Sequence, residues 1–216
     1  MYQHIPNMLT IARLILSAIF FLLLNQYRYP QGDAVYLWIA MGVFIIAALT
    51  DIADGYLARR LNVVSTFGRI MDPFADKVLT IGAFIYLAGS RFVDPIAIEQ
   101  GSFQTMISGI YPWMVVMILA RELLVTGIRG EMESRGIEFG ANIFGKMKTL
   151  LQCIGIPFLI GIVALDPRVP GREGLVYLQT FWAYAIVITT VLSGIPYVRN
   201  AYTASKSATT NRESLK

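Results

Sequence analysis

The sequence predicts an all-α integral membrane protein, with six transmembrane helices in one bundle. Of its 216 residues, 56% are hydrophobic, and the mean hydropathy is +0.58. Charged residues make up 15%, against about 25% in a typical soluble domain. The apolar residues come in blocks that are too long for strands and have no polar face, which favours membrane helices.

The apolar blocks predict six spans, with boundaries good to a few residues. They cover approximately Met8–Gln26, Val35–Ala58, Arg69–Gly89, Tyr111–Arg129, Phe144–Leu165 and Leu175–Val198. The first block contains Arg13, lacks a small-residue cleavage site and precedes further spans, so we expect a retained helix rather than a signal peptide. Stretches such as YRYPQGD and LDPRVPGREG carry the proline and glycine of turns.

We find no internal repeat and no linker in the chain. Residues 1–200 are therefore expected to form one six-helix transmembrane catalytic domain. Residues 201–216 are polar and are expected to form a disordered cytoplasmic tail.

The distribution of basic residues predicts the orientation in the membrane. An even number of spans places both termini on one side, and 14 of the 18 Lys and Arg residues fall there. The other four are Arg28, Arg91, Arg168 and Arg172. The positive-inside rule makes the side with 14 the cytoplasm. The net charge of +4 therefore indicates attraction to anionic lipid headgroups rather than to nucleic acid.

Cysteine and histidine usage excludes several kinds of site. Cys153 is the only cysteine and lies in an apolar run, so no internal disulfide can form and a packing role is expected. His4 is the only histidine, which excludes a zinc site built on several histidines and argues against a Ser-His-Asp triad.

Acidic and small residues follow helical spacing where the second predicted span ends and the third begins. One face of the first helix carries Asp51, Asp54, Gly55 and Ala58. One face of the next, at spacings of four, carries Gly68, Asp72 and Asp76. The connection LNVVSTF is short enough for a tight hairpin, so we expect the four carboxylates to surround one small volume.

Four carboxylates in a place of low dielectric need compensating protons or cations. Oxygen ligands without histidine or thiolate suit Mg²⁺ or Mn²⁺, and four could bridge two ions, a recurring arrangement for displacement at phosphorus. The small residues on the same faces would leave a cleft for a nucleotide, with Arg59 beside it. Alternatively, a single acid could serve helix packing or pair with Arg59, Arg69 or Lys77. The glycines could be packing residues.

The spacing D-x₂-D-G-x₂-A-R-x₈-G-x₃-D-x₃-D resembles the signature of the CDP-alcohol phosphotransferases, with every position present in DIADGYLARRLNVVSTFGRIMDPFAD. Further segments are similar to those of the bacterial phosphatidylglycerophosphate synthases: IPNMLTIAR, ARELLVTGIR, GKMKT and LSGIPY. This similarity covers most of the chain, although the two long connectors show no pattern that can be assigned.

The resemblance implies an activity and a location. The activity is transfer of the phosphatidyl group of CDP-diacylglycerol to sn-glycerol 3-phosphate, which gives phosphatidylglycerol phosphate and CMP. The protein would be a multi-pass homodimer in the bacterial cell membrane, with both termini and the active site cytoplasmic. Its cofactor would be Mg²⁺ or Mn²⁺, as two ions.

The resemblance also implies site roles. Asp51, Asp54 and Asp72 would hold metal, and Asp76 would both hold metal and act as the base. The cytidine end of CDP-diacylglycerol would lie in a cleft formed by Gly55, Ala58, Arg59 and Gly68.

A phosphate acceptor also requires cations. Arg121 and Arg129 lie eight residues apart, near one face of the fourth span, and Lys146 and Lys148 begin the fifth. We expect these four residues to bind glycerol 3-phosphate, with Glu122 holding one of the cations in place. The alternative is that they anchor the helices at lipid headgroups.

Two other functions stay open at this point. Another CDP-alcohol phosphotransferase, with inositol phosphate or phosphatidylglycerol as acceptor, would keep the same eight signature residues. A cation or proton transporter would also use intramembrane acids. It would place them near the midplane and in repeated halves, whereas these lie together at one side.

Overall fold

The computed structural model describes the backbone of residues 5–61, 66–134, 136 and 143–213, and the side chains of residues 8–51, 71, 73–134, 136 and 143–203. Six long helices dominate the described backbone: α1 (Ile5–Gln26), α2 (Ala34–Leu61), α3 (Thr66–Leu87), α5 (Pro112–Ser134), α6 (Ile143–Ala164) and α7 (Glu173–Glu213). The connection between α3 and α5 holds a 3₁₀ turn, η2 (Ser90–Phe92), and the short helix α4 (Pro95–Glu99). The prediction of an all-α protein is confirmed for the described residues.

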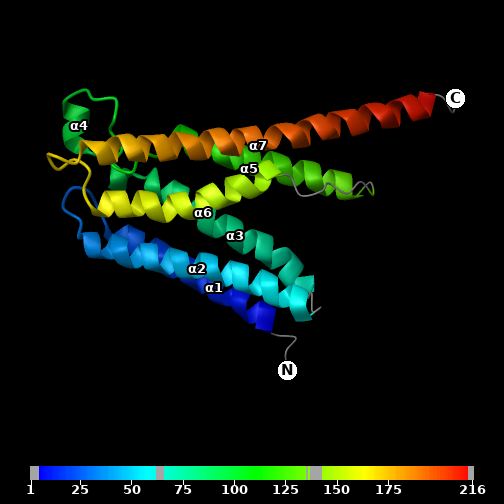
Figure 1. The fold of residues 1–216 in the computed structure, drawn as a ribbon, viewed down its shortest axis with the longest axis horizontal. Coiled ribbons are helices and arrows are strands. Elements are labelled where there is room, and N and C mark those ends of the chain that lie inside the picture. The colour runs from blue at the N-terminus through cyan, green and yellow to red at the C-terminus, as the bar shows by residue number, and fades with distance from the viewer. Residues whose placement is uncertain (1–4, 62–65, 135, 137–142, 214–216) are drawn as a thin grey trace.

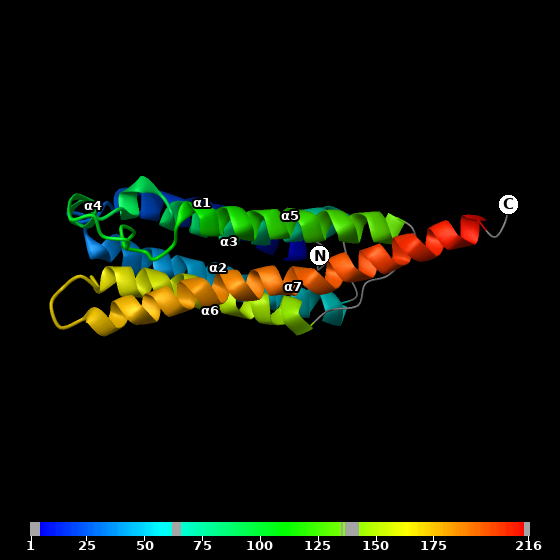
Figure 2. The same ribbon diagram turned by 90° about the horizontal axis from the view of Figure 1, so that it is seen from above.

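The long helices run along a common axis, and successive ones point in opposite directions (Figures 1 and 2). Helix α1 packs on α2 and α3, α6 packs on α2 and α7, and α5 packs on α7. Helix α3 also contacts α5 and α6. The two ends of the chain therefore lie at one end of the bundle, and α4 lies at the other (Figure 1).

Among the described residues, four helices are long and apolar enough to cross a membrane, over Met8–Gln26, Ala34–Asp51, Ile143–Ala164 and Glu173–Thr203. Helices α3 and α5 have 22 and 23 residues, and at about 1.5 Å per residue each matches a hydrocarbon core about 30 Å thick. They are not among the four, because they carry charged residues such as Asp76, Lys77, Arg121 and Glu122. Membrane-spanning character is thus confirmed, while the count of six spans stays a prediction.

Aromatic side chains hold α1 against its two neighbours. Phe20 and Phe44 are fully buried, with ring centroids 5.5 Å apart between α1 and α2. Phe21 stacks on Tyr86 of α3 with centroids 5.1 Å apart. The contact requires Gly82, since a Cβ atom there would collide with the Phe21 ring. These contacts fix how α2 and α3 lie relative to α1, and so position the acidic residues that the two helices carry.

Helix α7 continues to Glu213, through most of the segment for which the sequence predicted a disordered tail. Local sequence accounts for the difference. The last proline is Pro196, inside the helix, and no glycine or proline occurs from 197 to 213. Polarity alone does not end a helix, whereas those two residues do.

The end of the bundle that holds α4 is closed by a polar contact between two connections. Asp94 caps α4 by accepting hydrogen bonds from the backbone N–H groups of Ile96 and Ala97, at 3.1 and 3.2 Å. Its other carboxylate oxygen lies 3.3 Å from Nε of Arg168, which also donates to the carbonyl oxygen of Gln104. The α6–α7 connection is thereby fastened to the α3–α5 connection.

Candidate active site

Two of the predicted acidic residues have described side chains, and the fold brings them together. Asp51 lies on α2 and Asp76 on α3, and the charge of Asp51 acts on the Asp76 carboxylate. Both side chains are half-buried. The gathering of these carboxylates around one small volume stays a prediction.

The remaining signature residues lie on the same two helices. Asp54, Gly55, Ala58 and Arg59 belong to the last turns of α2, and Gly68 and Asp72 belong to the first turns of α3. Their side chains lie outside the described residues. The four-carboxylate cluster and the nucleotide cleft therefore stay predictions.

Arg13 of α1 joins the acidic pair, a contact that the sequence analysis did not assign. Its guanidinium is fully buried and forms an ion pair with Asp51 through Nη1 and Oδ1. The Asp51 side chain keeps 44% of its surface exposed, so its carboxylate stays accessible. Thr10 and Ser17 are buried on the same face of α1, three residues before and four residues after Arg13. An arginine within an apolar block, flanked at helical spacing by polar residues, was the available signal.

The described carboxylates fit a hard divalent cation. Asp51 and Asp76 supply oxygen ligands of the type that Mg²⁺ and Mn²⁺ prefer. Where side chains are described, no group of three or more His, Cys, Asp or Glu residues is gathered around one point. A full ligand set would need Asp54 and Asp72, which continue the same helices.

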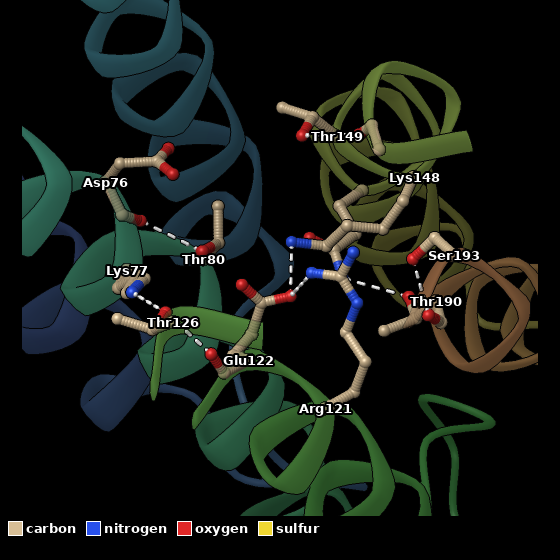
Figure 3. A network of polar contacts seen from close by, with 12 residues as sticks. Asp76, Lys77, Thr80, Arg121, Glu122, Thr126, Lys148, Thr149, Thr190 and Ser193 are labelled. Carbon is tan, nitrogen blue, oxygen red and sulfur yellow. Dashed lines mark hydrogen bonds and ion pairs between the residues drawn. The ribbon is translucent and has the colours of Figure 1, made fainter. Parts of the chain in front are cut away.

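A second charged cluster is built around Glu122 (Figure 3). Its Oε1 atom lies 2.9 Å from Nη1 of Arg121 and 2.5 Å from Nζ of Lys148. Arg121 and Glu122 come from α5 and Lys148 from α6, and each of the three side chains is 10 or 11% exposed. The expectation that Glu122 pairs with a cation of this region is confirmed.

The structure brings Arg121 and Lys148 together but leaves Arg129 and Lys146 apart from them. Arg129 is about half exposed, with Nη2 3.9 Å from Oε1 of Glu133, and Lys146 is exposed. Helix geometry explains both separations. A helix rotates by about 100° per residue, so Arg129 points about 80° away from Arg121 around the axis of α5. By the same measure, Lys146 and Lys148 differ by about 200° around the axis of α6. Arg121 and Arg129 therefore diverge, and Lys146 and Lys148 lie on opposite faces of α6.

Further hydrogen bonds extend from this cluster toward α3 and α7. Nζ of Lys77 donates to Oγ1 of Thr126 at 2.6 Å, and that hydroxyl donates to the carbonyl oxygen of Glu122 at 2.7 Å. Nε2 of Gln152 donates to Oγ1 of Thr190 at 3.2 Å between α6 and α7. Four helices thus meet at a polar site inside an apolar bundle.

The acidic pair lies close enough to the basic cluster for their charges to interact. The charges of Lys148, Arg13 and Glu122 all act on the Asp76 carboxylate. Cys153, one turn beyond Lys148 on α6, lies in the fields of Asp76, Asp51 and Lys148. Carboxylates that can hold a divalent cation therefore lie beside cations that can hold an anion, an arrangement suited to joining two phosphorylated substrates.

The model of the family described as CDP-alcohol phosphatidyltransferase matches residues 3–196, which is most of the chain. The chain belongs to this family. The match includes the signature on α2 and α3, the Glu122 cluster and all six long helices except the end of α7.

Curated relatives give the same family and cover most of the chain. The CDP-diacylglycerol–glycerol-3-phosphate 3-phosphatidyltransferase of Bacillus subtilis is 35% identical over 165 residues, which are 73% of this chain and 76% of the relative. The Cereibacter sphaeroides protein of that name is 32% identical, over a match that covers 83% of this chain and 73% of the relative. The Rickettsia bellii protein of that name is also 32% identical, covering 91% and 94%.

Proposed function

We propose that the protein transfers the phosphatidyl group of CDP-diacylglycerol to sn-glycerol 3-phosphate, giving phosphatidylglycerol phosphate and CMP. The single observation that carries the proposal is that Asp76 lies within electrostatic range of the Arg121–Glu122–Lys148 cluster, in a chain of this family. Relatives that cover most of the chain bear the name of this reaction.

The acidic residues serve the activated lipid. Asp51, Asp54, Asp72 and Asp76 would hold one or two divalent cations, Mg²⁺ or Mn²⁺. When bound, such ions neutralise charge on a pyrophosphate group. Gly55, Ala58, Arg59 and Gly68 would accept the cytidine end, because small residues let a nucleotide approach the helix backbone.

Asp76 accepts the proton from the 1-hydroxyl of glycerol 3-phosphate. The hydroxyl oxygen then forms a bond to the β-phosphorus of CDP-diacylglycerol, and the bond from that phosphorus to the bridging oxygen breaks. CMP leaves with the electron pair. No covalent enzyme intermediate is needed, since positioning and electrostatic stabilisation provide most of the catalysis in phosphoryl transfer.

Arg121 and Lys148 are the cations best placed to receive the phosphate of the acceptor, because both are largely buried and Lys148 acts electrostatically on Asp76. Arg129 and Lys146 are more exposed and belong to the approach to the site. A phosphate monoester is a dianion at neutral pH, and a guanidinium with an ammonium matches its charge.

The membrane arrangement follows from the two substrates. CDP-diacylglycerol keeps its acyl chains in the bilayer, and glycerol 3-phosphate arrives from water. We therefore propose six spans in a bacterial cell membrane, with the site and both termini on the cytoplasmic side, and a homodimer as the assembly. The excess of basic residues on that side supports the orientation.

The deciding experiment measures CMP release by purified protein given CDP-diacylglycerol and a divalent cation. Glycerol 3-phosphate, inositol phosphate and phosphatidylglycerol are compared as acceptors. We expect release to require glycerol 3-phosphate together with Mg²⁺ or Mn²⁺, and to stop with a chelator. Release with another acceptor alone would place the chain elsewhere in the family.

The Asp76→Asn variant tests the proposed base. We expect its rate to fall by about 10³-fold or more, since the carboxamide can neither accept the proton nor ligate as a carboxylate. The matched control is Glu99→Gln, an exposed carboxylate at the opposite end of the bundle, with wild-type activity expected. Thermal unfolding establishes that both variants fold. Activity of Asp76→Asn within a few-fold of wild type would remove this residue from the mechanism.

A further inference from the structure

One carboxylate oxygen holds two cations from different helices. Oε1 of Glu122 lies within hydrogen-bonding distance of both the Arg121 guanidinium and the Lys148 ammonium. Figure 3 shows both side chains directed at this atom, Arg121 from α5 and Lys148 from α6. The shared oxygen keeps two positive groups side by side that would otherwise repel each other.

The cluster has more positive than negative charge. Two cations and one carboxylate leave a net charge of +1. Nε of Arg121 is buried without a hydrogen-bond partner among the described residues. The arginine stem lies against Gly194 of α7, where Cγ would be 3.4 Å from an added Cβ atom. A largely buried guanidinium with an unused N–H donor can bind an anion supplied by a ligand.

We propose that Glu122 is a positioning residue for the acceptor, holding Arg121 and Lys148 together so that their remaining N–H donors receive one phosphate monoester. This inference rests on the proposed function. Glu122 itself contacts the two cations and not the substrate. Only its Oε1 atom contacts the two cations. Four N–H donors therefore remain on Arg121 and two on Lys148.

A purely structural ion pair would be built differently. One carboxylate and one cation neutralise each other and fasten two helices without excess charge. Here a second cation is added: among the described residues, Glu122 is the one carboxylate within ion-pair distance of either cation, and Asp76 lies further away, in the field of Lys148. The excess positive charge of the cluster therefore favours an acceptor that carries a phosphate dianion over an uncharged alcohol.

The test compares wild type with Glu122→Gln, which keeps the shape and removes the charge. We expect the KM for glycerol 3-phosphate to rise about tenfold or more, because two unneutralised cations no longer stay side by side. We expect kcat and the KM for CDP-diacylglycerol to stay within about threefold, since the acidic residues are untouched. Glu131→Gln, an exposed carboxylate on the same helix, is the control and should match wild type.

Conservative rescue and direct binding complete the test. Glu122→Asp keeps the negative charge on a side chain that is one methylene shorter. Its KM for glycerol 3-phosphate should therefore lie between those of wild type and Glu122→Gln. Calorimetric binding of glycerol 3-phosphate to the purified protein should weaken in the same order, and this readout does not depend on turnover.

An unchanged KM and unchanged affinity in Glu122→Gln would overturn the inference. So would a parallel loss of every kinetic parameter accompanied by a lower melting temperature, which indicates a structural role only. Failure of the proposed function looks different, since wild type itself would then release no CMP on addition of glycerol 3-phosphate.

Discussion

Arg13 is the most deeply buried charged residue described, and its ion pair with Asp51 ties α1 to the acidic site. A buried guanidinium is destabilising unless an anion balances it. The positive charge of Arg13 also acts on Asp76. This arginine thus offsets part of the repulsion between the two carboxylates and stabilises the end of the bundle where they meet.

Replacing Arg13 with methionine should lower the free energy of unfolding by about 1–3 kcal/mol. The estimate is modest for a buried pair because Asp51 is partly exposed and can be hydrated after the loss. Denaturant unfolding in detergent micelles measures the change. Arg28→Met, at an exposed position after α1, should stay within about 0.5 kcal/mol of wild type. Equal effects of the two substitutions would show that burial of the charge does not matter.

At the scale of single residues, the sequence predicted that Glu122 pairs with a cation, while the gathering of the aspartates stays a prediction. It could not predict that Lys148 rather than Lys146 meets Glu122, since that depends on how α6 is rotated against α5. It also left Arg13 unassigned. A sequence defines which residues share a face but not which face meets which neighbour.

Among the helices, α1 and α3 approach closely because Gly82 leaves space for the Phe21 ring. Gly42 of α2 offers a comparison, since an added Cβ atom would have nothing within 4 Å. Both glycines lie inside long helices, so the change to alanine brings a similar gain in helix propensity at each. Only the packing differs.

Gly82→Ala should therefore destabilise the protein by about 1–3 kcal/mol, because the ring must leave its stack on Tyr86. Gly42→Ala should be neutral or stabilise by up to about 1 kcal/mol. Thermal unfolding of the two variants side by side checks the difference. Equal stability of both variants would mean that α1 and α3 do not approach as described.

Hydropathy predicted the position of all six long helices, with every boundary except the end of α7 within about five residues. The predicted span Val35–Ala58 corresponds to α2, Ala34–Leu61, and Tyr111–Arg129 corresponds to α5, Pro112–Ser134. The predicted ends of α2, α5 and α7 were too short because a helix can continue past the apolar block. The extension of α7 to Glu213 is the largest such difference.

For the molecule as a whole, the two chain ends share one end of the bundle and the α4 connection lies at the other (Figure 1). The distribution of lysine and arginine predicts that the first of these ends faces the cytoplasm. Two exposed side chains mark the ends: Phe103 follows α4, and Tyr202 lies late in α7.

Cysteine labelling tests this orientation. In a Cys153→Ala background, Phe103→Cys should react in intact cells with a membrane-impermeant maleimide, once the reagent passes the outer envelope. Tyr202→Cys should react only after the cells are opened, because a charged reagent cannot cross the hydrocarbon core. The reversed pattern would place the site on the outer face.

Helix α7 contains 41 residues, which at about 1.5 Å per residue amounts to roughly 60 Å, twice the thickness of a hydrocarbon core. Ser193 lies beside the Glu122 cluster (Figure 3), so the rod extends about 30 Å further before Glu213. An affinity tag, a fluorophore or a surface tether fused after this rod would sit far from the chemistry. In enzyme immobilised in that way, the rod would hold the support about 30 Å away from the reactive end.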